Sequence, residues 1–238
     1  MTWSIVAKDP ATDQIGIAVS TCAFAVGARV PFIETGTGAI ASQAFVNPFY
    51  GLRGMALLRA GATAQQALDI LTSRDEGRSQ RQAHIQDKAG GIAAYTGADC
   101  VPWCGHLVRD TFSVAGNMLA GPEVIAETAR LYEARSDLPF AKRLIAALQA
   151  GEAAGGDKRG KQSAALLIHD CEEYALFDLR VDDHAEPLTE LERLERVAHQ
   201  RYLHYRKVMP RRDDPAGVID RDEIERRIVQ SIAAEAQA

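Results

Sequence analysis

The chain opens, directly after Met1, with the stretch Thr2-Trp3-Ser4-Ile5-Val6-Ala7. Its β-branched and aromatic residues predict a buried strand that begins at the second residue. Methionine is usually removed when a small residue follows it, so Thr2 can become the first residue of the protein. A free N-terminal threonine carries a hydroxyl nucleophile and its own base, an α-amine with an ordinary pKa of about 8. The alternative is that Thr2 is an ordinary second residue without a catalytic role.

Groups of short β-rich runs follow along the chain. We expect strands over residues 2–8, 14–20, 26–35, 38–43, 81–87, 92–96, 106–109, 112–118, 163–169 and 175–181. Turn residues such as Asp9-Pro10 and Gly90-Gly91 separate them. In the second run, large Ile15, Ile17 and Val19 alternate with small residues, which indicates that one face allows close packing.

Two pairs of helices lie between these groups of strands. The first pair begins at Asn47-Pro48 and at the capping box Thr63-Ala64-Gln65-Gln66, and the second at Gly121-Pro122 and Asp137. The helix after Asn47 is expected to bury an apolar stripe of Phe49, Leu52, Met55 and Ala56. Because the helices come in pairs rather than singly between strands, we predict an α+β fold. Its architecture is a four-layer αββα sandwich of two mainly antiparallel sheets.

The composition excludes several classes of protein. The chain has 238 residues, 47% of them hydrophobic, and a net charge of −5, which argues against a nucleic-acid partner. No run is long enough for a membrane span and the start lacks a secretory pattern, so we expect a cytoplasmic protein without a membrane partner.

The four cysteines, Cys22, Cys100, Cys104 and Cys171, are too few and too scattered for a disulfide framework. Cys100 and Cys104 precede His106, but no second cysteine pair has zinc-site spacing. We therefore expect buried free thiols, no metal and no cofactor.

The character of the chain changes at Pro187, which predicts one domain over residues 1–186 and a helical extension over 187–238. The extension has two apolar stripes, Leu188, Leu191, Leu194 and Val197 on a helix running to about residue 207, and Ile224, Ile228 and Ile232 on a helix over 220–233. Such stripes need a covering surface, either the main domain or a second subunit. We expect a homo-oligomer, a dimer or higher.

A glycine-rich loop, Gly155-Gly156-Asp157-Lys158-Arg159-Gly160-Lys161-Gln162, nearly matches a phosphate-binding loop. Gln162 stands where the metal-binding hydroxyl is required, and the hydroxyl comes one residue later at Ser163. A predicted helix precedes the loop and a strand follows it, the reverse of a nucleotide site. The basic residues still leave two alternatives open, a site for a carboxylate-bearing ligand and a solvated turn.

Gln43 and Asn47 lie at a predicted strand-to-helix junction, and Asn117 lies at the end of a later predicted strand. The side-chain amides of all three can donate to a developing oxyanion. For Asn47, capping of the helix that follows is the simpler explanation. Asp182-Asp183-His184 follows the last predicted strand. These residues form either a metal-binding site or the turn after an edge strand whose charges neutralise each other, and we favour the second explanation.

Together these segments resemble the domain of unknown function 1028 family, placed in the superfamily of N-terminal nucleophile hydrolases. The resemblance runs in order over about residues 2–190 and rests on residues 2–7, Ser42-Gln43-Ala44 with Asn47-Pro48, 94–97, 116–122, 155–160 with 162–165, and 178–184. It implies the αββα sandwich and, by superfamily chemistry, amide-bond hydrolysis by a first-strand Thr, Ser or Cys, the position that Thr2 occupies.

These observations lead to one expected function and one alternative. We expect an amide (C–N bond) hydrolase acting on a small, carboxylate-bearing substrate, with Thr2 as nucleophile and base and Gln43, Asn47 or Asn117 polarising the carbonyl. The expected substrate-binding residues are those of the glycine-rich loop, Asp157, Arg159, Lys161, Gln162 and Ser163. The alternative is a non-catalytic ligand-binding or assembly protein on the same scaffold.

Overall fold

The computed structural model describes residues 2–236. Its strands are β1 (Thr2–Lys8), β2 (Ile15–Thr21), β3 (Pro31–Glu34), β4 (Gly38–Ala44), β5 (Arg81–Asp87), β6 (Ile92–Thr96), β7 (Gly105–Val108), β8 (Phe112–Asn117), β9 (Ser163–His169) and β10 (Phe177–Val181). They form a six-stranded sheet in the order β10–β9–β2–β1–β8–β7 and a four-stranded sheet in the order β3–β4–β5–β6. All neighbouring strands run antiparallel. The prediction of two antiparallel sheets is therefore confirmed.

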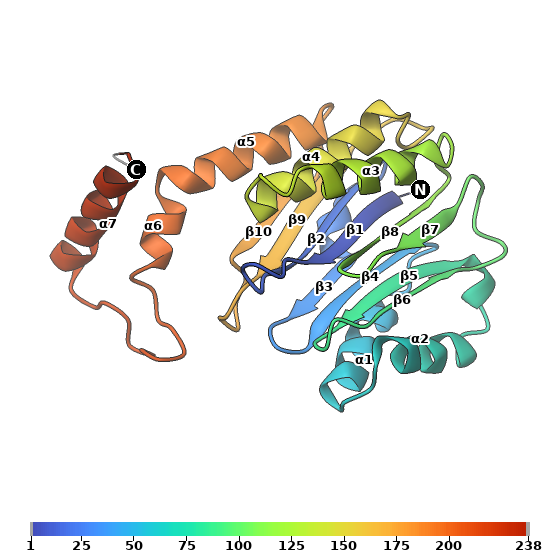
Figure 1. The fold of residues 1–238 in the computed structure, drawn as a ribbon, viewed down its shortest axis with the longest axis horizontal. Helices are drawn as coiled ribbons and strands as arrows, with labels where there is room; N and C mark the ends of the chain where they lie inside the picture. Colours follow the sequence, from blue (N-terminus) through green and yellow to red (C-terminus); the bar gives the residue numbers. More distant parts are fainter. Residues whose placement is uncertain (1, 237–238) are drawn as a thin grey trace. The chain divides into compact units, whose positions relative to one another are not determined.

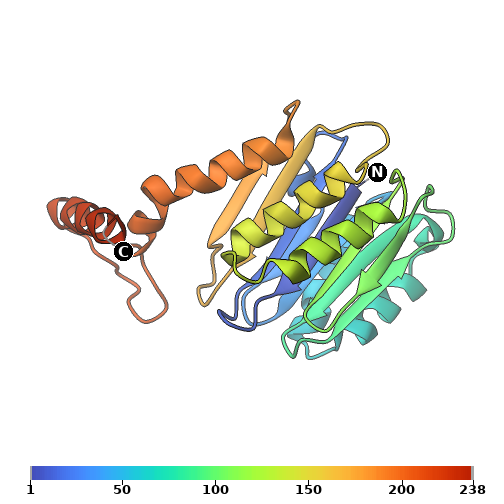
Figure 2. The same ribbon diagram turned by 45° about the horizontal axis from the view of Figure 1, so that its top comes forward.

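A pair of helices covers the outer face of each sheet. The helices α1 (Pro48–Arg59) and α2 (Ala64–Ser73) contact strands β3 to β6, whereas α3 (Glu123–Ala134) and α4 (Phe140–Ala153) contact β1, β2, β7, β8 and β9. The sheets contact each other through β1 with β4 and β5 with β8, so the layers run helix, sheet, sheet, helix (Figure 1). Figure 2 shows α3 and α4 lying across the six-stranded sheet.

Because side chains alternate along each strand, they contribute to three packed regions: one between the two sheets and one between each sheet and its helix pair. On β4, Ile40 packs with α1 and α2, while Ala39 and Ala41 pack between the sheets with residues of β1 and β2. On β1, Ser4 faces the four-stranded sheet, where it contacts His84. Trp3 faces α4, where a Cβ added to Gly151 would lie 2.9 Å from the indole nitrogen. Small residues thus let the layers approach closely.

The stretch 26–35 is not the single strand that was predicted. Residues Val26–Ala28 form a short 3-10 turn, η1, and β3 begins only at Pro31. The backbone turns at Ala25, which has a φ of 53°, and Ser163 Oγ accepts a hydrogen bond from the Val26 N–H. A side chain from a distant strand therefore fixes the turn.

The buried face of α1 also differs from the prediction. Phe49 and Leu52 are exposed, and the buried residues of the helix are Tyr50, Gly51, Gly54, Met55 and Leu58. A Cβ at Gly51 would lie 2.2 Å from the Phe32 ring. The helix is rotated so that its two glycines lie against the sheet beside Tyr50, Met55 and Leu58, while Phe49 and Leu52 face outward.

Two of the other predicted helix starts follow the local sequence to different degrees. Thr63 forms the predicted capping box with Gln66 at the start of α2. The proposed cap at Asp137 is wrong, because α4 begins after Pro139 and Asp137 binds Arg135 instead. The carboxylate of Asp137 therefore pairs with Arg135 and does not cap the N-terminus of α4.

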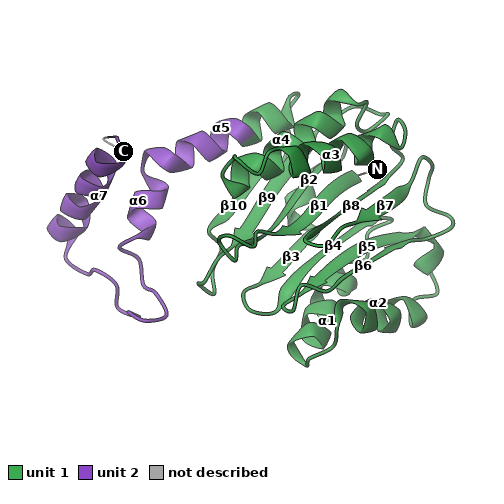
Figure 3. Ribbon diagram, in the orientation of Figure 1, with its two compact units in different colours: residues 1–191 green, residues 192–238 purple. Residues whose placement is uncertain are grey.

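The chain divides into two compact units, residues 1–191 and 192–238, so the division falls inside α5 (Pro187–Gln200) (Figure 3). The sequence-based boundary lies a few residues earlier, at 186/187. In the second unit, α6 (Tyr202–Arg206) and α7 (Arg221–Glu235) contact each other, and Asp220 caps α7. His204 is buried and its Nδ1 lies 2.8 Å from Ser231 Oγ. Within the described residues, no helix combines the length and apolar character that a membrane span requires.

Candidate functional site

Thr2 is the first residue of β1 and lies on the inner face of the six-stranded sheet. It pairs with Asn117 of β8, and its side chain is only 7% exposed. Its Oγ1 donates a hydrogen bond to Thr21 Oγ1 over 3.2 Å. The hydroxyl expected to act as nucleophile therefore lies in polar surroundings between the sheets.

Two buried amides hold the backbone of Thr2. Asn117 Nδ2 donates to the Thr2 carbonyl over 3.3 Å, and Gln43 Nε2 lies 3.5 Å from the same oxygen. Both amides also donate to Gln82 Oε1, over 2.9 and 2.8 Å, and Gln43 donates to the Ala115 carbonyl over 3.1 Å. Because a primary amide has two N–H bonds, these contacts engage both groups fully. In this arrangement Gln43 and Asn117 position Thr2 and have no N–H left for an oxyanion.

Gln82 is the centre of this cluster, and the sequence reasoning missed it. Its Nε2 lies within 3.0 Å of three acceptors, Thr96 Oγ1 and the carbonyls of Gly105 and Gly116. The side chain is completely buried. Its signal in the sequence is the period-two series Gln82, His84 and Gln86, separated by the apolar Ala83 and Ile85, which places three polar side chains on one face.

His84 extends the cluster and is neutral. Ser4 Oγ donates to Gln43 Oε1 over 2.6 Å, so it must accept at 2.8 Å from His84 Nε2. His84 Nδ1 then accepts from Ser113 Oγ, also at 2.8 Å. Complete burial, with a smaller contribution from His106, lowers the pKa of His84 to about 3. The polar layer is therefore a fixed network without a titrating base near pH 7.

The chain leaves both strands that carry these amides through a left-handed residue. Ala44 follows Gln43 with a φ of 70°, and Met118 follows Asn117 with a φ of 60°. Non-glycine residues seldom adopt this conformation, and such strain concentrates at functional sites. The strand ends beside Thr2 are thus unusual in both side chains and backbone.

The glycine-rich loop packs next to Thr21, the residue whose hydroxyl contacts Thr2. Asp157 is buried, and its carboxylate accepts from the backbone N–H groups of Cys22 and Arg159 over 2.9 and 2.8 Å. The N–H of Gln162 donates to the Thr21 carbonyl over 2.9 Å. The loop thus lies against the end of β2, where Thr21 contacts Thr2.

The side chains of the loop have different partners. Arg159 is 43% exposed and binds Asp157 over 3.3 Å. Lys161 lies between Glu186 and Glu152, which raise its pKa, so its charge is already compensated. Gln162 Nε2 donates to Asp183 Oδ1 over 3.1 Å, and Ser163 Oγ bonds the Ala23 carbonyl.

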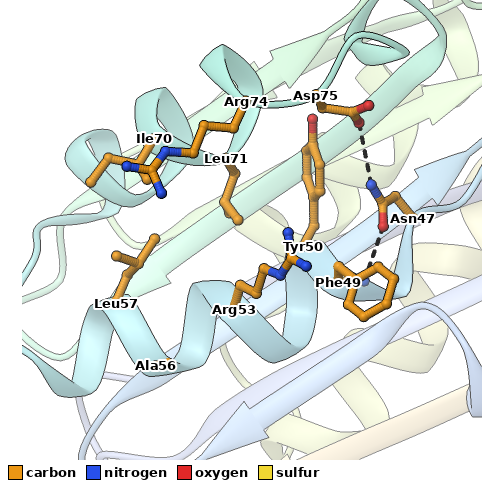
Figure 4. Close-up of a pocket in the computed structure, with 10 residues that line it drawn as sticks. All are labelled: Asn47, Phe49, Tyr50, Arg53, Ala56, Leu57, Ile70, Leu71, Arg74 and Asp75. Atoms are coloured by element: carbon orange, nitrogen blue, oxygen red, sulfur yellow. Dashed lines mark hydrogen bonds between the residues drawn. The ribbon is translucent and has the colours of Figure 1, made fainter.

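Asn47 makes its contacts at the helix layer and not with Thr2. Its Oδ1 accepts from the Phe49 N–H over 3.1 Å, and its Nδ2 donates to Asp75 Oδ2 over 3.3 Å (Figure 4). This is the capping role that the sequence offered as the simpler explanation. Asn47 also lines a pocket between α1 and α2.

The remaining sequence candidates have local partners. Arg180 binds Asp182 over 3.0 Å, as in a neutralised edge strand, and His184 Nδ1 accepts from the Glu186 N–H. All four cysteines are free, but only Cys100 is buried, so the expectation of buried thiols holds for that residue alone. Within residues 2–236, no three His, Cys, Asp or Glu side chains are grouped to hold a metal ion.

Comparisons with known proteins give a family and a fold. The crystal structure of protein SPO2555 from Silicibacter pomeroyi, itself assigned to DUF1028, is 34% identical in sequence, with a TM-score of 0.86 over 92% of this chain and 96% of that one. No protein with a curated description matches. The model of the family of unknown function DUF1028 matches residues 2–191. The chain therefore belongs to the DUF1028 family.

Proposed function

We propose that the protein is an amide hydrolase of the N-terminal nucleophile type, with Thr2 as its first residue after removal of Met1. The observation that carries this proposal is the pair of amides, Gln43 and Asn117, on the Thr2 carbonyl. First residues of a chain normally fray. A nucleophile at that place needs a clamp of this kind, and a plain second residue does not. The layering of the two sheets and helix pairs supports the same assignment.

The chemistry needs only the atoms of Thr2. Its Oγ1 attacks the carbonyl carbon of the substrate while the α-amine takes the hydroxyl proton. The amine then passes this proton to the leaving nitrogen as the C–N bond breaks, which leaves an ester on Thr2. Water, deprotonated by the same amine, hydrolyses that ester and restores the hydroxyl. The amine must be free and neutral, so acylation by a retained Met1 would prevent the reaction.

The proposed substrate is small and bears a carboxylate. Arg159 supports this, because its guanidinium is half-exposed and belongs to the loop that packs beside Thr21. Asp157 fixes the loop from its buried side, and a guanidinium binds a carboxylate with two parallel hydrogen bonds. We assign Lys161, Gln162 and Ser163 to holding the loop.

A second candidate is a non-catalytic ligand-binding or assembly protein. The observation that favours it is that the N–H groups of Gln43 and Asn117 are all engaged, so neither can stabilise an oxyanion. Assembly as a homo-oligomer is compatible with both candidates, since Val229 and Ile232 of α7 are exposed. The two candidates differ in what a change at Thr2 does.

Replacing Thr2 with alanine is expected to lower amide hydrolysis about 10³-fold or more, because the nucleophile is lost. Thr2→Ser should retain measurable activity, since it keeps both the hydroxyl and the amine. Hydrolysis is measured against amides offered in pairs with and without a carboxylate, and the proposal expects the carboxylates to be preferred. Thr37→Ala is the control, because Thr37 is also a buried threonine but its Oγ1 bonds Glu34.

Two results would contradict the proposal in different ways. A protein that begins at Thr2 and hydrolyses no amide of the panel would favour the non-catalytic candidate. Hydrolysis that persists unchanged in Thr2→Ala would show that Thr2 is not the nucleophile. In either case the clamp on Thr2 would serve only to anchor β1.

A further inference from the structure

A pocket of about 440 Å³ lies between α1 and α2 (Figure 4). Its volume falls within the range of small-molecule sites. Ala56, Leu57, Ile70 and Leu71 give it an apolar wall, and Tyr50, Arg53, Arg74 and Asp75 supply its polar groups. Thr2 is not among the lining residues, so the pocket is separate from the site proposed above.

The hydroxyl of Tyr50 has no hydrogen-bond partner within residues 2–236, although the side chain is only 2% exposed. Burial, and then the nearby Asp75 carboxylate, raise the pKa of Tyr50, so the hydroxyl stays protonated and can donate. Buried polar groups are nearly always paired, and one that is not needs an explanation. A ligand oxygen in the pocket would satisfy it.

Arg53 and Arg74 supply the positive charge of the pocket. Neither forms an ion pair among the described residues, and Arg53 stacks over the Phe49 ring at 4.6 Å. Their guanidinium groups reach toward the pocket from α1 and from the end of α2 (Figure 4). By contrast Arg59, on the same helix as Arg53, is paired with Glu34.

The one carboxylate of the pocket, that of Asp75, is already occupied. It accepts from Arg81 Nε over 2.9 Å, from the Gly77 N–H over 2.9 Å and from Asn47 over 3.3 Å. Burial alone would raise the pKa of Asp75, but these hydrogen bonds, together with the neighbouring Tyr50 hydroxyl, lower it to about 2. Asp75 therefore does not neutralise Arg53 or Arg74, and the pocket attracts anions.

We propose that this pocket binds a small organic carboxylate with a compact apolar body. The carboxylate pairs with Arg53 and takes the hydrogen bond that Tyr50 offers, and Arg74 adds a second positive charge at the other wall. The apolar body lies against Leu57 and Leu71, which inorganic phosphate could not use. The proposal does not depend on hydrolysis at Thr2.

Phenylacetate is a suitable probe, with its binding to the full chain followed by calorimetry or ligand-observed NMR. We expect saturable binding that weakens at least tenfold in Arg53→Gln and less in Arg74→Gln. Phenylacetamide, the neutral analogue, should bind at least tenfold more weakly. Arg130→Gln is the matched control, because Arg130 is an exposed helical arginine of α3 paired with Glu127, and its loss should leave binding unchanged.

Tyr50→Phe gives a second, independent readout. Since the hydroxyl makes no hydrogen bond among the described residues, its removal should leave the Tm of the free protein unchanged or raise it, and yet weaken phenylacetate binding. A hydroxyl with a purely structural role would lower the Tm and leave binding unaltered.

Several outcomes would overturn the proposal. One is that phenylacetate, benzoate and hexanoate all fail to bind saturably. Another is that Arg53→Gln binds phenylacetate as tightly as the wild type does. A third is that inorganic phosphate binds as tightly as the carboxylates. A dimer that Arg53→Gln dissociates would also overturn it, because a second copy of the chain would then occupy the pocket.

Discussion

Replacing Gln82 with alanine is expected to lower the free energy of unfolding by about 3–5 kcal/mol. Gln82 Oε1 accepts from both Gln43 and Asn117, and its Nε2 serves two carbonyls and Thr96 Oγ1. Alanine would leave these groups buried without partners and would open a cavity between the sheets. Each unpaired buried group costs about 1–3 kcal/mol, although such costs are not additive. The clamp on Thr2 should loosen as well, so any activity should fall with stability.

Gln86→Ala is the matched control for this change. Gln86 has the same side chain as Gln82, lies on the same face of the same strand and is equally buried. Among the described residues, however, its Nε2 makes one hydrogen bond, at 3.3 Å to the Thr111 carbonyl, and its Oε1 makes none. Its loss should cost about 1–2 kcal/mol. Urea unfolding of the wild type and both variants measures the difference. Equal losses for the two glutamines would show that Gln82 is not the centre of the network.

Acidification should destabilise the protein through His84. Its pKa is about 3 in the folded protein against an ordinary value of 6.5, so below pH 6.5 the unfolded chain binds a proton that the folded chain excludes. Stability from this residue is complete above pH 6.5 and is lost progressively as the pH falls toward 3. Between pH 7.5 and 4.5 the loss should be about 2–3 kcal/mol, from 1.36 kcal/mol per pH unit over two units.

His84→Gln separates this effect from the other titrating groups. Glutamine can still bond Ser4 and Ser113 but takes up no proton. Denaturant unfolding at pH 7.5 and 4.5 should therefore show a smaller loss for the variant than for the wild type, by about 2–3 kcal/mol. A pH dependence identical in both proteins would mean that His84 accepts a proton in the folded state.

The sequence predicts the layered fold because its signals are local. Strands such as β5 and β9 have the predicted bounds, and the capping box of Thr63 and Gln66 marks the start of α2 correctly. The failures involve partners that are distant in the sequence. Ser163 fixes the turn at Val26, and Phe32 determines which face of α1 is buried.

The candidate site shows the same division. The structure brings Thr2, Gln43 and Asn117 together at the ends of their strands, but their hydrogen bonds could not be deduced from the sequence. Gln82 joins them only once β5 is placed opposite β1 and β8. No local pattern shows that Asn47 would face Asp75, 28 residues away, instead of Thr2.

The most direct test of the central proposal is mass spectrometry, which shows whether the chain begins at Thr2 and whether Thr2 becomes acylated. Protein purified from its source cells is treated with a small activated ester, and its intact mass and N-terminal peptide are measured. We predict a chain that begins at Thr2 and gains one acyl group there, which hydroxylamine removes and which Thr2→Ala does not acquire. A chain that retains Met1 throughout, or a label spread equally over lysines in both proteins, would contradict the role of Thr2 as nucleophile.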